Sequence, residues 1–196
     1  MYKKIYFITF IIILIICIFF AYKNLKFGNN INKSDDYNIL NISSYDATVE
    51  VEVHSNKNTN KYVLKQKYDA PNIFKQEVIE PENIKGLTTN FDGTNLIIQN
   101  KSLHLQSFYE NYNCMQGNSL SLISFIEQYK KDEEAEIIES DEEKILKIKS
   151  NENNKYEMYK KLYISKNTNL PIKMEILDFN QNTTVYILYR EIKINK

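Results

Sequence analysis

The chain of 196 residues is long enough for one ordinary domain with an appendage. Its 25 basic and 25 acidic residues cancel, which excludes the strongly basic surface on which nucleic-acid binding depends. Two histidines and two cysteines are too few for a dedicated metal centre, and four glycines are too few for a phosphate-binding loop.

The first element is an uncharged apolar run from Ile5 to Tyr22, flanked by Lys3, Lys4 and Lys23. About 18 helical residues nearly cross a hydrocarbon core about 30 Å thick, and flanking lysines reach the polar interface. The run lacks the small-residue cleavage site of a secretory signal peptide. We therefore predict an uncleaved transmembrane anchor over residues 1–23, with the remainder of the chain outside the cytoplasm.

The alternative for this segment is a lipoprotein signal, in which Cys17 would carry the lipid. A lipoprotein signal has small residues directly before its cysteine, whereas Ile16 stands there in this chain. The apolar run also continues past the cysteine through Phe20. These features favour the uncleaved anchor and leave lipidation at Cys17 as the alternative.

Residues 24–44 are polar and rich in Asn and Ser, which indicates a tether between the membrane and a folded domain. The pair Ile39-Leu40, together with Ile42, suits a short helix or strand packed on the edge of that domain. We place the domain itself at residues 45–196.

From Tyr45 onward, apolar and polar residues alternate, which predicts a strand with one buried and one solvated face. Further short apolar segments follow as far as Leu105, with breaks at Ala70-Pro71, Glu80-Pro81 and Asp92-Gly93. The last break predicts a hairpin, because tight hairpin turns need a positive φ that glycine readily adopts. The pattern is typical of a meander of antiparallel strands.

One segment, residues 120–129, has helical periodicity and follows two candidate capping residues, Asn118 and Ser119. One face of this predicted helix carries Leu122, Ile126 and Tyr129. A helix this apolar must lie on the sheet, and we expect it on the concave side. These three side chains are therefore candidates to face a ligand or partner.

After the helix, five further strands are predicted, at residues 135–139, 145–149, 156–165, 170–179 and 184–194. The sequence thus predicts an α+β fold of about ten strands. We expect a strongly curved antiparallel sheet with one or two helices in its concave side, preceded by the transmembrane helix.

The sequence contains no recognisable catalytic motif. His54 and His104 fall on polar-facing strand positions, without a further ligand at metal-binding spacing. Cys114 is expected to be a small partly buried apolar residue rather than a nucleophile paired with His104. We therefore expect a binding protein without enzymatic activity or a cofactor of its own.

Aromatic side chains on the later strands are candidates for a protein interface, because tyrosine is enriched at such surfaces. They are Tyr159, Tyr163 and Tyr186. On the last strand, Arg190 is expected to pair with a carboxylate or to stack on a tyrosine, with a role in reading a ligand as the alternative.

The ordered motifs of residues 45–196 resemble those of the GerS family of clostridial germination proteins, within the LolA-like superfamily. Motifs that carry this resemblance are Lys65-Gln66-x-Tyr68, Phe74-Lys75-x-Glu77, Phe91-Asp92-Gly93-x-x-Leu96-x-Ile98 and Leu170-Pro171-Ile172-Lys173. Abundant Asn, Ile, Lys and Tyr, without any Trp, fit the AT-rich genome of such a Gram-positive bacterium. GerS proteins are lipoproteins, which the Ile16-Cys17 pair does not match.

The resemblance implies an exported protein in the forespore envelope that binds and activates a cortex amidase like CwlD. That partner would be a zinc-dependent N-acetylmuramoyl-L-alanine amidase, whose product leads to the cortex modification recognised at germination. The expected mechanism is allosteric, in which an exposed sheet face or edge strand holds the amidase in its metal-binding state. A homodimer is a further possible assembly.

A LolA-like carrier or sensor is the alternative, in which the hollow of the sheet binds a lipid or a lipoprotein acyl chain. The helix at residues 120–129 distinguishes the two hypotheses, because a helix that fills the hollow tightly leaves no room for cargo. A membrane anchor also disfavours a shuttle, since a carrier must leave the membrane.

Overall fold

The computed structural model describes residues 38–112, 118–150 and 154–196. The predicted anchor at Ile5 to Tyr22, with Cys17, and the segment that holds Cys114 lie outside these residues. Contacts between residues divide the chain into two units, Met1–Asp36 and Tyr37–Lys196, and the described residues belong to the second. Within the described ranges, no helix has the length and apolarity to cross a membrane.

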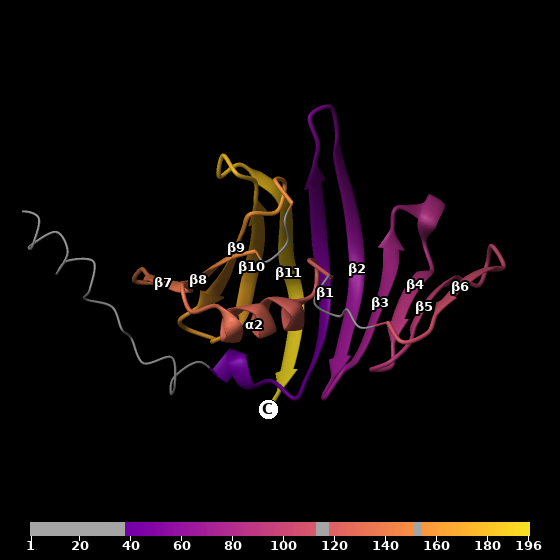
Figure 1. The fold of residues 1–196 in the computed structure, drawn as a ribbon, viewed down its shortest axis with the longest axis horizontal. Helices are drawn as coiled ribbons and strands as arrows, with labels where there is room; N and C mark the ends of the chain where they lie inside the picture. Colours follow the sequence, from indigo (N-terminus) through magenta and orange to yellow (C-terminus); the bar gives the residue numbers. More distant parts are fainter. Residues whose placement is uncertain (1–37, 113–117, 151–153) are drawn as a thin grey trace, which may run out of the picture. The chain divides into compact units, whose positions relative to one another are not determined.

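Eleven antiparallel strands form one open sheet, in the order β6-β5-β4-β3-β2-β1-β11-β10-β9-β8-β7 (Figure 1). The strands are β1 (Ser44–His54), β2 (Thr59–Asp69), β3 (Ile73–Glu80), β4 (Leu87–Phe91), β5 (Leu96–Asn100), β6 (Leu105–Tyr109), β7 (Glu136–Glu139), β8 (Glu143–Lys149), β9 (Tyr159–Ser165), β10 (Pro171–Leu177) and β11 (Thr183–Asn195). Among the described residues, the helices are α2 (Leu122–Lys131) and two 3-10 turns, η1 (Asn38–Asn41) and η2 (Glu82–Ile84).

The order of the strands makes the sheet two meanders joined at its centre. One meander consists of β1 to β6, with β6 at the edge of the sheet. The other consists of β7 to β11, with β7 at the opposite edge. The two meanders meet where β1 pairs with β11. The predicted antiparallel sheet is confirmed, with eleven strands where about ten were expected. The last apolar segment before the helix was expected to end at Leu105, whereas β6 begins at that residue and continues to Tyr109.

The predicted hairpin at Asp92-Gly93 is confirmed between β4 and β5. Gly93 has a φ of +99°, which glycine adopts without the steric cost of a side chain. One carboxylate oxygen of Asp92 accepts hydrogen bonds from the backbone N–H groups of Thr94 and Asn95, at 2.9 and 2.7 Å. These bonds favour the ionised carboxylate and lower the pKa of Asp92.

Helix α2 lies on the connection between β6 and β7, and so between the two edges of the sheet. It begins at Leu122, two residues later than predicted, because the chain first forms a turn. In that turn the Ser121 N–H donates to the Asn118 carbonyl at 3.0 Å, and the Leu120 N–H donates to the Asn118 side chain at 3.2 Å. Neither predicted cap is therefore used as one, and Ser121 takes the N-cap position.

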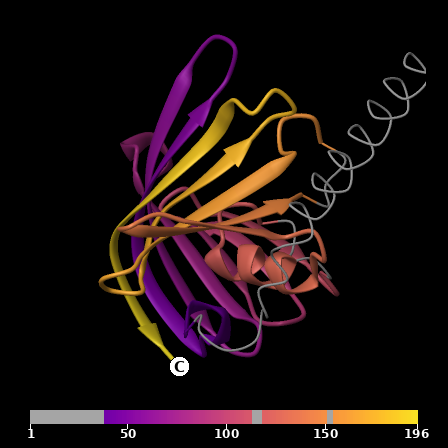
Figure 2. The same ribbon diagram turned by 90° about the vertical axis from the view of Figure 1, so that its left-hand side faces the viewer.

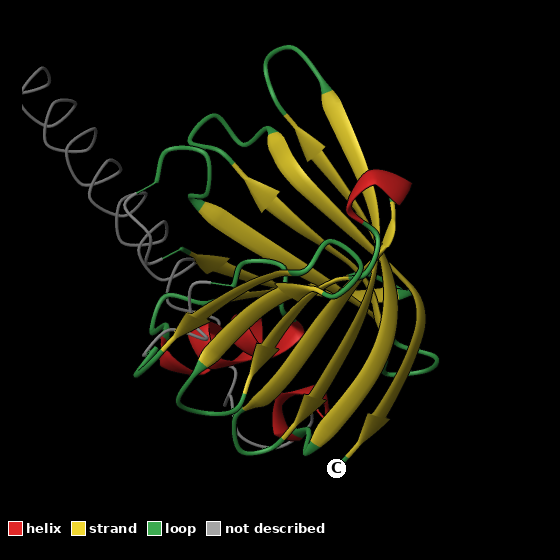
Figure 3. Cartoon of the chain, turned by 90° about the vertical axis from the view of Figure 1, so that its right-hand side faces the viewer, coloured by secondary structure: helices red, strands yellow, loops and turns green. Residues whose placement is uncertain are grey.

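The sheet is curved, and α2 lies against its concave face (Figures 2 and 3). The helix buries Leu122, Phe125, Ile126 and Tyr129 in one core with inward residues of both meanders, such as Val49 and Leu146. Burial of several large apolar side chains, each worth roughly 1.5–3 kcal/mol, holds the helix on the sheet. The helix was predicted to lie on the concave side of the sheet, and the structure confirms this.

The packed unit also includes part of the predicted tether. Turn η1 places Ile39 and Leu40 in the core, and Ile42 is buried beside them. The short first helix expected for these residues is confirmed as a 3-10 turn. The packed unit thus begins before residue 45, where the sequence alone placed the domain boundary.

Leu122→Ala tests the role of α2 in the core. The Leu122 side chain is 0% exposed, and a buried Leu-to-Ala change lowers the free energy of unfolding by about 2–5 kcal/mol. We expect a loss in that range in urea unfolding of the full chain in detergent, followed by circular dichroism. The matched control is Leu105→Ala, at a leucine that is 62% exposed, with an expected change below about 0.5 kcal/mol. Equal losses would contradict the core position of α2.

Candidate functional site

The edge strand β6 exposes all five of its residues, Leu105-Gln106-Ser107-Phe108-Tyr109, and none of them is charged. Exposed apolar side chains gather on this strand and in the segments beside it. We call these residues the β6 patch: Leu103, Leu105, Phe108, Tyr109 and Tyr112. An edge strand has a row of backbone N–H and C=O groups without a partner strand, so it is a natural site for another chain to pair.

A row of apolar residues connects the β6 patch with the core across six strands. Paired neighbours along this row are Tyr45, Tyr68, Phe74, Phe91, Leu96 and Tyr109. The first four are buried, Leu96 is half-buried, and Tyr109 is exposed at the end. The Tyr112 ring lies edge-on to the Phe91 ring, with centroids 6.5 Å apart. The centroid of the Tyr112 ring is also 6.4 Å from that of the Tyr109 ring. The exposed aromatic rings therefore rest on a rigid base, which suits an interface.

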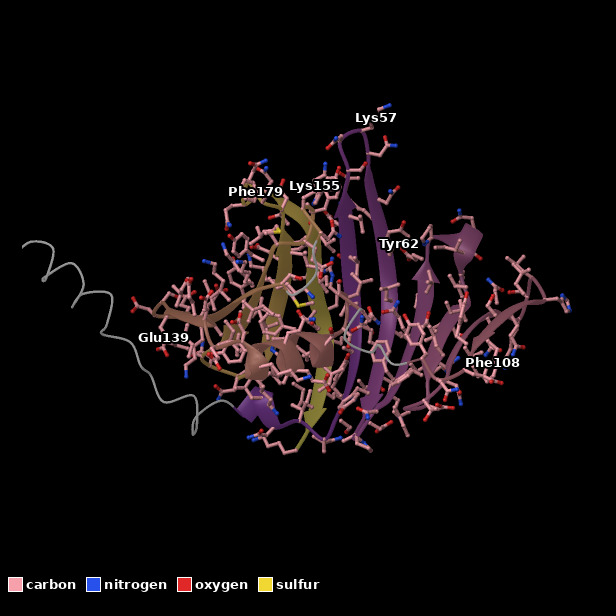
Figure 4. All side chains as sticks on the ribbon, in the orientation of Figure 1. Lys57, Tyr62, Phe108, Glu139, Lys155 and Phe179 are labelled. Carbon is pink, nitrogen blue, oxygen red and sulfur yellow. The ribbon has the colours of Figure 1, made fainter. Side chains whose placement is uncertain are left out.

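The opposite edge, β7, has a different surface. Its sequence is Glu136-Ile137-Ile138-Glu139, and its acidic residues pair with Lys147 at 3.2 Å and Lys166 at 2.9 Å. Charged side chains on an edge strand discourage pairing with another chain. Figure 4 marks the two edges by Phe108 and Glu139, at opposite sides of the sheet. The uncharged edge is therefore the one suited to a partner.

The three tyrosines predicted as interface candidates lie on the outer face of the sheet. The residues that alternate with them on β9, such as Leu162, point into the core, so Tyr159 and Tyr163 point away from it. Tyr163 donates a hydrogen bond to Glu175 at 2.8 Å, and the Lys173 ammonium lies 4.0 Å from the centre of its ring. Burial, and then the contact with Glu175, raises the pKa of Tyr163.

Tyr186 belongs to the same outer cluster, with the Lys173 ammonium 5.7 Å from its ring. Tyr159 lies further along β9, where the ammonium of Lys147 is 5.6 Å from its ring. Each of the three rings is half-buried among charged neighbours. The structure thus brings Tyr163 and Tyr186 together, but on a face separate from the β6 patch.

Arg190 pairs with a carboxylate, one of the two roles expected for it. Its guanidinium lies 2.7 Å from the Glu50 carboxylate, at the bulge where the register of β1 and β11 shifts after Thr48. This contact raises the pKa of Arg190. Both side chains are more than one-third exposed, so the pair contributes little to stability.

The helix side chains named as ligand-facing candidates fill the hollow of the sheet. Leu122, Ile126 and Tyr129 are each at most 1% exposed, and Phe125 stacks on Tyr129 with ring centroids 6.2 Å apart. Tyr45 and Tyr189 are buried in the same core, and burial raises the pKa of both phenols. The Tyr45 hydroxyl lies near Ser121 without well-formed hydrogen-bond geometry. A close-packed hollow disfavours the carrier hypothesis.

A buried ion pair joins Lys160 on β9 to Glu157, just before that strand, and the sequence patterns did not indicate it. Lys160 is 1% exposed, and its ammonium lies 2.8 Å from the Glu157 carboxylate and 3.3 Å from the Gln128 side chain. Both carboxylate oxygens of Glu157 lie 2.7 Å from the Ser119 hydroxyl. Ser119 therefore ties the turn before α2 to the sheet instead of capping the helix. The available signal was the period of two along the strand, which places Lys160 on the same face as Met158 and Leu162.

Among the described residues, no group of three or more His, Cys, Asp or Glu side chains is arranged to hold a metal ion. His54 contacts the Thr59 hydroxyl at 3.1 Å, on the solvent-exposed hairpin between β1 and β2. His104 lies in the turn before β6 with a φ of +56°. His54 ends β1 on its exposed side, as expected, whereas His104 was expected on a strand and lies in a turn instead.

Glu157→Gln tests the buried ion pair. The amide retains a bond with Ser119 but leaves the Lys160 ammonium without its counter-charge, and breaking such a pair costs about 3–5 kcal/mol. We expect urea unfolding to show a loss of about 3 kcal/mol. The double variant Glu157→Gln/Lys160→Met should unfold at a higher urea concentration than Glu157→Gln alone, because it removes the uncompensated charge. A single variant as stable as the parent chain would contradict the pairing.

Comparisons with known proteins found a matching family model and several similar solved structures. One chain of the complex between the CwlD amidase and the GerS lipoprotein of Clostridioides difficile is 26% identical, with 90% of this chain and 91% of that chain covered and a TM-score of 0.49. A LolA superfamily protein of Nitrosomonas europaea is 10% identical over 79% of this chain and 87% of its own, with a TM-score of 0.40.

An uncharacterised conserved protein of Thermus thermophilus shares the fold, at 12% identity over 82% of this chain and 83% of its own, with a TM-score of 0.52. The search of curated proteins found no match. A family model described as "Sporulation protein YdcC-like" matches residues 3–196, nearly the whole chain. The chain therefore belongs to the YdcC-like family of sporulation proteins.

Proposed function

We propose that this chain is a non-catalytic sporulation protein that binds a cortex peptidoglycan amidase through the β6 edge and activates it. The uncharged, exposed edge with its aromatic patch is the observation that carries this proposal. Membership in a sporulation family and the motif order that resembles the GerS family support the choice of partner. The complex named in the comparison, of GerS with CwlD, is of the same kind.

The chemistry of the edge suits a partner that contributes an extended segment. Backbone groups of such a segment add a strand to the sheet beside β6, and side-chain pockets supply the specificity. Phe108 points to one face of the strand, and Leu105 and Tyr109 point to the other. Exposed aromatic residues on a rigid base are typical of the few residues that dominate the energy of an interface.

Activation follows from binding if the β6 edge is complementary to only one state of the amidase. A ligand shifts an equilibrium between two states by the difference in its affinity for them. In the proposal, the edge binds the zinc-loaded, active conformation more tightly, so complex formation raises the population of that conformation. The zinc and the catalytic groups belong to the partner.

The proposed location is the outer face of a membrane in the developing spore. The predicted anchor at Ile5 to Tyr22 would hold the domain on the same side as the peptidoglycan, or Cys17 would do so through a lipid. In either arrangement a tethered protein meets its partner at a raised local concentration.

The test is co-purification of the full chain, in detergent, with the organism's own cortex amidase, followed by assays of amide hydrolysis with and without added zinc. We expect a complex and a higher rate of hydrolysis in the presence of the chain. The variant Leu105→Lys/Phe108→Lys places two charges on the edge, and we expect at least about tenfold weaker binding. Its matched control is Ile138→Lys on the opposite edge, which should bind as the parent chain does.

Two results would count against the proposal. Failure to form a complex, or a complex without any gain in hydrolysis, would reject the role of amidase activator. Equal loss of binding by the β6 variant and the β7 control would reject the β6 edge as the interface. Circular dichroism of each variant would confirm that the fold is retained.

A further inference from the structure

A cavity of about 810 Å³ lies at the end of the sheet where the β1–β2 hairpin projects. One wall is that hairpin, residues 53–58, and the other is formed by the β10–β11 turn with residues 154–157. Figure 4 shows Lys57, Lys155 and Phe179 together at this end of the molecule, away from Phe108 on the β6 edge. The volume is in the range of small-molecule sites.

Both walls are held in place by hydrogen bonds. On the hairpin, the Ser55 hydroxyl and N–H donate to the Asn58 carbonyl at 2.9 Å. On the other wall, the Thr184 hydroxyl donates to the Tyr156 carbonyl at 2.8 Å, and the Phe179 N–H donates to the Lys155 carbonyl at 3.0 Å. The cavity is thus preformed, which lowers the entropy cost of binding a ligand.

The two carboxylates that line the cavity already have partners. Glu157 is held by Ser119 and by the buried Lys160. Asp178 accepts hydrogen bonds from the Asn182 N–H at 2.8 Å and from its side chain at 3.1 Å, which lowers the pKa of Asp178. These groups therefore stabilise the walls and do not form a cation site.

The polar side chains that remain available in the cavity are mostly uncharged. Among the described residues, the side chains of Asn56, Asn58 and Thr183 make no hydrogen bond with another part of the protein. Each asparagine side chain offers two N–H donors and a carbonyl acceptor. The threonine hydroxyl can donate one hydrogen bond and also accept. Lys57 carries the one ammonium group among the lining residues. Lys160 is buried and does not line the cavity.

Apolar groups complete the lining. Val53 and Val185 form an aliphatic part above the buried Ile176. The Tyr156 ring, 55% exposed, lies at the rim, with the Lys155 ammonium 5.0 Å from the centre of the ring. A ligand that fits must therefore combine apolar C–H surfaces with neutral donors and acceptors. An acyl chain would leave the amides unpaired, and a polyanion would meet Glu157 and Asp178 with few cations to oppose them.

We infer that this cavity binds a neutral N-acetylated glycan. A pyranose ring has an apolar C–H face that packs on an aromatic ring, and its rim of hydroxyl groups matches the amides and the threonine. An acetamido group adds one donor and one acceptor for the asparagine side chains, together with a methyl group for the aliphatic part. This site is separate from the β6 edge, so the inference does not rest on the amidase partnership.

The experiment is isothermal titration calorimetry of the full chain, in detergent and without amidase, with the β-1,4-linked tetramer of N-acetylglucosamine. We expect saturable binding to the parent chain and about three- to tenfold weaker binding to Tyr156→Ala. The variant Thr183→Val, which removes one hydroxyl at constant size, should also bind more weakly. The matched control is Phe179→Ala, at an exposed aromatic residue at the same end of the molecule that does not line the cavity; it should bind as the parent chain does.

Two results would overturn the inference. One is the absence of binding up to about 10 mM of the tetramer, a range that covers weak single-site affinities. The other is binding that Tyr156→Ala and Thr183→Val leave unchanged, or that Phe179→Ala weakens equally. Circular dichroism would confirm the fold of each variant. Because the assay contains no amidase, its outcome is independent of whether the β6 edge binds one.

Discussion

The structure depends on one helix that must fill the concave side of an open sheet. Helix α2 lies on the connection that joins β6 to β7, at opposite edges, so its position is tied to the topology of the chain. Its apolar face meets inward residues from both meanders in a single core. Without this helix, the concave side would expose a large apolar surface, which a soluble domain rarely tolerates.

This constraint leaves the two edges and the two ends of the sheet as places for function. Leu122, Phe125, Ile126 and Tyr129 occupy the part of the hollow that α2 covers, which disfavours cargo binding there. The edges differ in chemistry, since β7 is lined by paired charges and β6 is uncharged and aromatic. The hairpin end carries a cavity whose carboxylates are already satisfied. The proposed protein interface and the proposed glycan site therefore lie on separate surfaces of one scaffold.

Local patterns in the sequence were sufficient for much of the fold. Alternation from Tyr45, the turn at Asp92-Gly93 and the periodicity of residues 120–129 each predicted an element that the structure contains. Each of these signals arises within a few neighbouring residues. The family resemblance, which rested on ordered motifs, agrees with the YdcC-like family match.

Features that depend on distant contacts could not be predicted in this way. Ser119 does not cap the helix as predicted, since its hydroxyl bonds to Glu157, which is 38 positions away. The bulge that brings Arg190 to Glu50 depends on the pairing of the first and last strands. Strand β6 has neither clear alternation nor a buried residue, and its position at an edge follows only from the order of the whole sheet.

In the proposed complex, β6 rather than β7 accepts the partner. Hydrogen exchange of the full chain, alone and in complex with the cortex amidase, measures this directly, because a new strand protects the backbone N–H groups of the edge it joins. We predict slower exchange at Leu105–Tyr109 in the complex and unchanged exchange at Glu136–Glu139. Protection confined to Glu136–Glu139, or unchanged exchange at both edges, would contradict it.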